Sequence, residues 1–119
     1  SELPCKKMEL TTEVARAKRI IDLKDAPDTI EVSMSCIIVG GAAFIGFPGE
    51  PFVEIGRKIR KGSPFKTNIL CCLTNGGDYY FPTASAYDEG GYEAATSHLK
   101  RGTAEKLAEE SVKLITELN

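Results

Sequence analysis

A strand-to-helix turn over residues 46–52, Gly-Phe-Pro-Gly-Glu-Pro-Phe, constrains the fold of this chain more than any other stretch. The apolar residues just before it are too few for a helix, so they predict a strand over residues 42–47. After the turn, apolar residues recur three and four positions apart, ending with Ile55 and Ile59, which predicts a helix over residues 52–61.

The turn carries one carboxylate, Glu50, between Pro48 and Pro51. Each proline fixes its own backbone and biases the preceding residue towards an extended geometry. Glu50 is therefore held stiffly near the start of a helix. A carboxylate at this place often only complements the helix dipole, and this reading stays open beside a functional one.

A second apolar run, Ile-Leu-Cys-Cys-Leu, predicts a strand over residues 68–73 that is covered on both faces. With strand 42–47 and helix 52–61 it forms a β-α-β unit, whose two strands are parallel. Ligands gather at the carboxyl ends of parallel strands. Glu50 and the loop over residues 75–80 both leave such ends, so we expect a carboxylate and tyrosine hydroxyls to converge there.

The remaining pattern predicts a mixed sheet in an α/β fold. Residues 30–38 alternate with period two, and Gly40-Gly41 then favours a tight hairpin into strand 42–47. Helices are expected over residues 12–24 and 103–118, and with helix 52–61 they should cover the sheet. Residues 1–10 are expected to form a flexible leader, and residues 11–119 a single domain.

Composition excludes several classes of protein. The chain has 119 residues with a net charge of −2, which gives no basis for electrostatic binding of nucleic acid. No apolar run approaches the ~20 residues of a transmembrane helix, and no signal peptide is visible. The four cysteines lack Cys-x-x-Cys spacing, so buried free thiols are expected. Free thiols favour a cytoplasmic location.

The chain is poor in groups for hydrolytic chemistry. It has one histidine, His98, without a clear partner, so we assign it no role. A Ser-His-Asp arrangement cannot be assembled. A catalytic zinc site normally takes three protein ligands, so Glu50 and a distant histidine amount to half a site.

Five short motifs occur in a fixed order along the chain. They are Phe47-Pro48-Gly49-Glu50, Gly56-Arg57-Lys58, Leu73-Thr74-Asn75, Tyr80-Phe81-Pro82-Thr83 and Tyr92-Glu93-Ala94. With them, roughly residues 30–118 resemble the neutral/alkaline (non-lysosomal) ceramidase family, in the C-terminal part of its catalytic domain. Members of that family carry a Pro-Gly/Ala-Glu turn, an apolar strand ending in Asn, a Tyr-x-x-Thr step and a Tyr-Glu pair, in this order.

The resemblance implies a zinc-dependent amide hydrolase of sphingolipid metabolism. By motif match, Glu50 and Tyr80 would be zinc ligands, and Tyr92 would line the active site as a catalytic residue. The family's histidine ligands and nucleophilic serine belong to a region upstream of the matching portion and have no counterpart here. Pro51 and Phe52 stand where ceramidases usually have Phe-Thr-Thr, which leaves the substrate open.

Two hypotheses follow. In the first, the chain is a fragment or subunit of a ceramidase-like hydrolase that supplies Glu50 and Tyr80 and is inactive alone. Zinc belongs to the complete site, and this chain alone should bind it weakly or not at all. Its partner would be an upstream hydrolase region, a partner chain or a second copy. In the second, it is a non-catalytic α/β interaction module that keeps the fold without a metal site.

Overall fold

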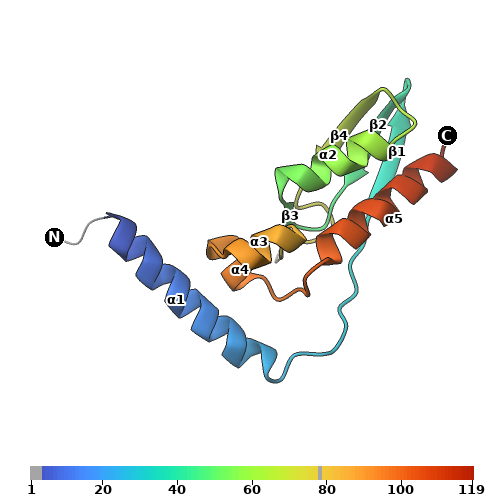
Figure 1. Ribbon diagram of the computed structural model, residues 1–119. Helices are drawn as coiled ribbons and strands as arrows, with labels where there is room; N and C mark the ends of the chain where they lie inside the picture. The colour runs from blue at the N-terminus through green and yellow to red at the C-terminus, as the bar shows by residue number, and fades with distance from the viewer. Residues whose placement is uncertain (1–3, 78) are drawn as a thin grey trace.

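The computed structural model describes residues 4–77 and 79–119 (Figure 1). Its helices are α1 (Pro4–Leu23), α2 (Val53–Gly62), α3 (Ala84–Glu89), α4 (Tyr92–Thr96) and α5 (Thr103–Glu117). Its strands are β1 (Ser35–Val39), β2 (Ala42–Gly46), β3 (Glu50–Pro51), β4 (Thr67–Cys71) and β5 (Tyr80–Phe81). The alternation of strands and helices confirms the predicted α/β class.

Three strands form a mixed sheet in the order β1-β2-β4. β1 and β2 are antiparallel, and the hairpin between them passes through Gly40 and Gly41, whose φ angles of +54° and +82° suit glycine. β2 and β4 are parallel and are joined through α2. The predicted hairpin and β-α-β unit are therefore confirmed, with β2 at the centre of the sheet.

The hydrophobic core lies on one face of this sheet. Ala43 and Ile45 of β2 are buried against Ile55 and Ile59 of α2. α5 contributes three further buried residues, Ala104, Ala108 and Ile115. α2 and α5 pack against each other and cover this face together (Figure 1). Burial of each large aliphatic side chain contributes about 1.5–3 kcal/mol, so this contact is a main source of stability.

The opposite face of the sheet is exposed and apolar. The register places Ile37, Phe44 and Ile69 in one row across β1, β2 and β4. Ile37 is 63% exposed and Ile69 is 42% exposed. The prediction that strand 68–73 is covered on both faces is therefore wrong. β4 lies at an edge of the sheet, and only its inward side chains, such as Leu70, pack against the core.

The first strand is shorter than its alternating pattern predicts. Pairing begins at Ser35, which lies opposite Gly46, the last residue of β2. Beyond Gly46 the chain turns through Phe47 and Pro48 away from the ladder, so the residues before Ser35 find no partner strand. Residues 30–34 keep an alternating sequence without the strand that it predicts.

The first helix differs from prediction in its start and its position. It begins at Pro4 rather than near residue 12, so residues 4–10, expected as part of a leader, are helical. Proline is well tolerated in the first turn of a helix, and the residues after it favour helix. α1 packs against α4 and extends away from the sheet, instead of covering it (Figure 1).

Candidate functional site

The turn that carries Glu50 is fastened to the end of β4 by backbone hydrogen bonds. Phe47 donates to the Cys71 carbonyl at 2.8 Å, and Leu73 donates to the Gly49 carbonyl at 3.0 Å. Gly49 adopts a φ of +135°, and a Cβ at this position would lie 2.4 Å from the Tyr79 carbonyl oxygen. Glycine is therefore required here for the turn to approach β5 closely.

β3 and β5 form a short parallel ladder in which Glu50 lies opposite Tyr80. The Glu50 amide donates to the Tyr79 carbonyl at 3.0 Å, and the Phe52 amide donates to the Phe81 carbonyl at 3.2 Å. Neighbouring strands lie about 5 Å apart, and opposed residues project to the same side. The structure thus brings together the two residues that the sequence predicted to converge at strand ends.

Tyr92, the first residue of α4, joins this pair. Its ring centroid lies 6.2 Å from that of Tyr80, with an interplanar angle of 74°. This is the edge-to-face arrangement that aromatic pairs prefer. Tyr92 is 39% exposed, so its ring contacts Tyr80 and also solvent. Glu50, Tyr80 and Tyr92 are called the Glu-Tyr cluster below, and their roles as metal ligands and catalytic residue stay predictions.

A buried aromatic contact supports the cluster from inside. Phe47 and Phe81, both almost fully buried, meet edge to face with ring centroids 5.0 Å apart. Phe81 directly follows Tyr80, so alternation along the strand places the phenylalanine inward and the tyrosine outward. The contact fixes the turn to β5 and with it the spacing of Glu50 and Tyr80.

The charge of Glu50 acts on its neighbours. It is the main cause that raises the pKa of Tyr80, followed by burial and then by Tyr92 and Glu93. Burial first, and then Cys71 and Glu50, raise the pKa of the Cys72 thiol. The cluster is therefore a place of negative potential, where a neutral phenol and a neutral thiol are favoured in the absence of a cation.

Cys72 is the residue near this site that sequence reasoning missed. An apolar strand predicted a buried thiol, but β4 ends at Cys71 and Cys72 is exposed. The prediction is wrong for this residue, because the chain leaves the sheet one position earlier. The adjacent residues Cys71 and Cys72 gave no indication in the sequence that Cys72 lies near Glu50. Cys36, Cys71 and Cys72 are free, as predicted, but Cys36 and Cys71 are only half-buried, so the predicted burial is wrong for them too.

Glu50 and Tyr80 both carry oxygen atoms, and the register places the two residues opposite each other. Zinc accepts carboxylate oxygen among its ligands and usually takes four in total. No group of three or more His, Cys, Asp or Glu residues suited to a metal occurs in the described part of the chain. His98 is exposed and lies elsewhere, with its Nε2 3.9 Å from an Asp22 oxygen. Whether Glu50 and Tyr80 act as metal ligands therefore stays a prediction.

A buried serine positions the strand that carries Tyr80. Ser97 is only 1% exposed, and its Oγ donates to the Tyr80 carbonyl at 3.0 Å. The Tyr87 hydroxyl lies 3.0 Å from the same Oγ, and the Leu99 amide donates to it at 3.3 Å. The Ser97 carbonyl in turn accepts a hydrogen bond from Arg19 of α1. Ser97 thus ties β5 to three other segments of the chain.

The comparison with known proteins identifies no family for this chain. The sequence matches no model of a known protein family and no curated protein. None of the helices in the described part of the chain combines the length and apolar character that crossing a membrane requires.

Proposed function

We propose that this chain supplies part of the metal site of a zinc-dependent amide hydrolase related to the neutral ceramidases. Glu50 and Tyr80 would provide two oxygen ligands, and Tyr92 would lie beside the bound substrate. The observation that carries the proposal is the register of the β3–β5 ladder, which sets Glu50 directly opposite Tyr80. The edge-to-face contact of Tyr92 with Tyr80 supports it.

The chemistry of the two residues is suited to this role. When bound, zinc would polarise the amide carbonyl and activate the attacking group. Tyr80 would have to release its proton to serve as a ligand, so metal binding should become tighter as pH rises. The Tyr92 hydroxyl, on the exposed side of the pair, can donate to or accept from a polar group of the substrate.

The other ligands and the nucleophile have to come from another polypeptide segment. The apolar row of Ile37, Phe44 and Ile69, in which both isoleucines are exposed, supports this part of the proposal, because a partner region that covered it would bury substantial apolar area. We therefore expect the chain to hydrolyse no ceramide on its own, and to gain activity only with that partner.

A zinc titration of the ¹⁵N-labelled chain, followed by NMR, tests the metal site. We expect weak, saturable shifts of amide signals around Glu50 and Tyr80, because two ligands cannot hold zinc tightly. Glu50→Ala and Tyr80→Phe should each remove these shifts. Glu54→Ala, which removes a carboxylate from the first turn of α2 instead, should keep them.

Three results would count against the proposal. Shifts that persist in both cluster variants would place the metal elsewhere. Tight stoichiometric binding would contradict a half site, and unchanged spectra at saturating zinc would remove the metal role of Glu50 and Tyr80.

The alternative is a non-catalytic interaction module, and the exposed apolar row favours it as much as it favours the first proposal. In that function Glu50 would only complement the dipole of α2, although Phe52 occupies the N-cap position. The zinc titration separates the two, because an interaction module requires no metal at the Glu-Tyr cluster.

A further inference from the structure

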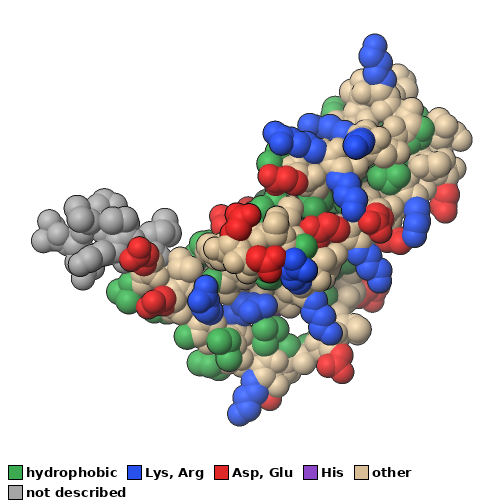
Figure 2. Space-filling model, in the orientation of Figure 1, with side chains coloured by type: hydrophobic (Ala, Val, Ile, Leu, Met, Phe, Trp, Pro, Cys, Tyr) green, Lys and Arg blue, Asp and Glu red, His purple; other side chains and the backbone are tan. Residues whose placement is uncertain are grey.

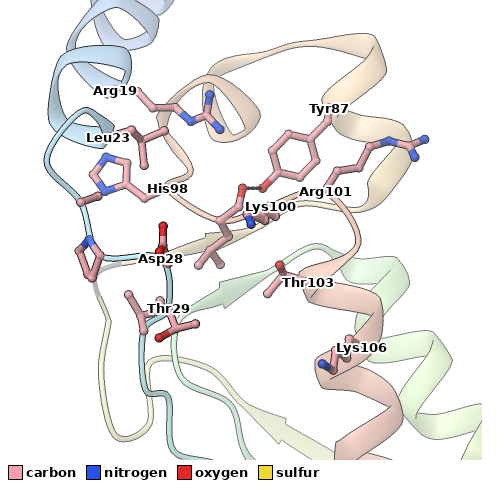
Figure 3. Close-up of a pocket in the computed structure, with 14 residues that line it drawn as sticks. Arg19, Leu23, Asp28, Thr29, Tyr87, His98, Lys100, Arg101, Thr103 and Lys106 are labelled. Carbon is pink, nitrogen blue, oxygen red and sulfur yellow. Dashed lines mark hydrogen bonds between the residues drawn. The ribbon is translucent and has the colours of Figure 1, made fainter.

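A cavity of about 820 Å³ lies between the end of α1, the segment that follows it and the start of α5 (Figure 3). Its lining contains neither Glu50 nor Tyr80 nor Tyr92, so it is separate from the Glu-Tyr cluster. Cavities of about 300–1,000 Å³ are typical of sites for small organic ligands. Its volume falls within this range.

The lining of this cavity is basic. Four of its side chains are Lys or Arg, and the only lining carboxylate in the described part of the chain is Asp28. Figure 2 shows Lys and Arg side chains from α1 towards α5, with Asp and Glu side chains between them. The chain as a whole has a net charge of −2, so the positive charge here is a local concentration.

The four cations differ in how they are held. Arg19 donates to the Ser97 carbonyl, and Arg101 pairs with Asp88 at 2.7 Å. These two are fixed by the protein and form part of the wall.

Lys100 and Lys106 form no ion pair within the described part of the chain. Figure 3 shows Lys100 in the central part of the cavity wall, and Lys106 below it on the first turns of α5. Two ammonium groups without partners at one cavity are available to an anionic ligand.

The start of α5 adds to the positive potential. Thr103, its first residue, lines the cavity, and the N-cap residue Gly102 provides no side-chain hydrogen bond. The helix has 15 residues, so its N-terminal end carries the partial positive charge of a full macrodipole. Glu105 in the first turn offsets part of this potential with its own negative charge, and its Oε1 accepts a hydrogen bond from the Ala84 amide at 2.7 Å.

The rest of the wall is apolar or aromatic. Leu23, Ile30 and Leu99 line it together with Tyr87. The Tyr87 hydroxyl lies 3.0 Å from the Leu99 carbonyl oxygen, which fixes the ring against the cavity (Figure 3). A ligand that fills the site would therefore meet both cationic and apolar groups.

The geometry points to a binding site for a small organic phosphate monoester. The phosphate would lie between Lys100, Lys106 and the start of α5, and the organic group would pack near Leu23, Ile30 and Tyr87. A monoester carries a charge of about −1.5 to −2 at pH 7, which matches two lysines better than a single carboxylate does. Ammonium groups and helix N-termini are common phosphate partners.

Calorimetric titration of the full chain at low salt tests the site, with phenyl phosphate, inorganic phosphate and phenol as probes. We expect saturable binding of phenyl phosphate, weaker binding of inorganic phosphate and no measurable binding of phenol. K100A/K106A should weaken phenyl phosphate binding about tenfold or more, because two charge-assisted contacts are lost. Asp28→Asn should strengthen binding, since it removes the carboxylate from the lining.

The matched control is K61A/K66A, which removes two exposed lysines outside this cavity and should leave the affinity unchanged. Circular dichroism checks that each variant is folded. If both double variants lost the same affinity for phenyl phosphate, the effect would be one of general charge, and the proposed site would be wrong. Equal affinity for inorganic phosphate and phenyl phosphate, or for phenol and phenyl phosphate, would overturn the assignment of a phosphate ester.

Discussion

Glu50 is the main cause that raises the pKa of Tyr80, and the two residues lie opposite each other on parallel strands. Glu50→Gln should therefore lower the pKa of Tyr80 towards its ordinary value, as followed by NMR of ¹³Cζ-labelled tyrosine. The matched variant Glu54→Gln, at the start of α2, should leave the titration unchanged. An unchanged Tyr80 pKa in Glu50→Gln would show that the carboxylate points away from the phenol.

The raised pKa of Tyr80 also determines the direction in which stability changes with pH. The pKa of Tyr80 is raised in the folded protein, so the folded state favours the neutral phenol. The resulting contribution to folding stability is fully present below the unfolded pKa of about 10 and is lost as pH rises through the folded pKa. Urea denaturation above pH 10 should show this loss in the wild type and a smaller one in Glu50→Gln. A greater loss in the variant would contradict the assigned cause.

Ser97 supports the Glu-Tyr cluster through the backbone carbonyl of Tyr80. Ser97→Ala would leave the Tyr80 carbonyl and the Leu99 amide without their buried partner. A buried polar group left unpaired costs about 1–3 kcal/mol, so unfolding by urea should show a loss of this size. Ser33→Ala, at an exposed position before β1, is the control and should change stability by less than about 0.5 kcal/mol. Equal losses in both variants would contradict the role of Ser97.

At the scale of elements, the sequence correctly predicted the strands and the helix that depend on local residue patterns. β2, α2 and β4 follow from apolar runs, a proline-stiffened turn and helical spacing, and their parallel order follows from the crossover rule. The convergence of Glu50 with Tyr80 was expected from the carboxyl ends of these strands, whereas the β3–β5 ladder that pairs them was not predicted. Where the length or burial of a strand depends on its neighbours, the residue pattern alone did not predict it. β1 begins only at Ser35, opposite the last residue of β2, and the exposure of one face of β4 depends on which layers cover the sheet.

The ladder between β3 and β5 depends on Gly49. Gly49→Ala would strain a backbone at a φ of +135° and would drive a Cβ into the Tyr79 carbonyl oxygen. Strain of this kind costs about 1–3 kcal/mol, and the collision adds to it. The matched variant Gly76→Ala, at a φ of +143° with open space around its Cβ, should carry the strain alone. Urea unfolding should therefore show a clearly larger loss for Gly49→Ala, and equal losses would contradict the close approach.

At the scale of the whole molecule, the two faces of the described sheet differ in how they are covered. α2 and α5 cover one face of the sheet, while the other carries Ile37, Val39 and Ile69 in solvent. Sheets with two apolar faces normally bury both, and two sheets can pack face to face about 10 Å apart. An isolated chain has only another copy of itself with which to cover this face.

The isolated chain should therefore self-associate through the sheet. Sedimentation velocity should show an average mass that rises with concentration, because association removes the row of Ile37, Phe44 and Ile69 from water. Ile37→Lys should shift the equilibrium strongly towards monomer, since it would bury an unpaired charge at the interface. Val53→Lys, which changes a similarly exposed apolar residue at the start of α2, should associate like the wild type. A wild-type chain that stays monomeric at high concentration would show that the exposed row alone does not drive association, and it would weaken the argument that a partner region covers this face.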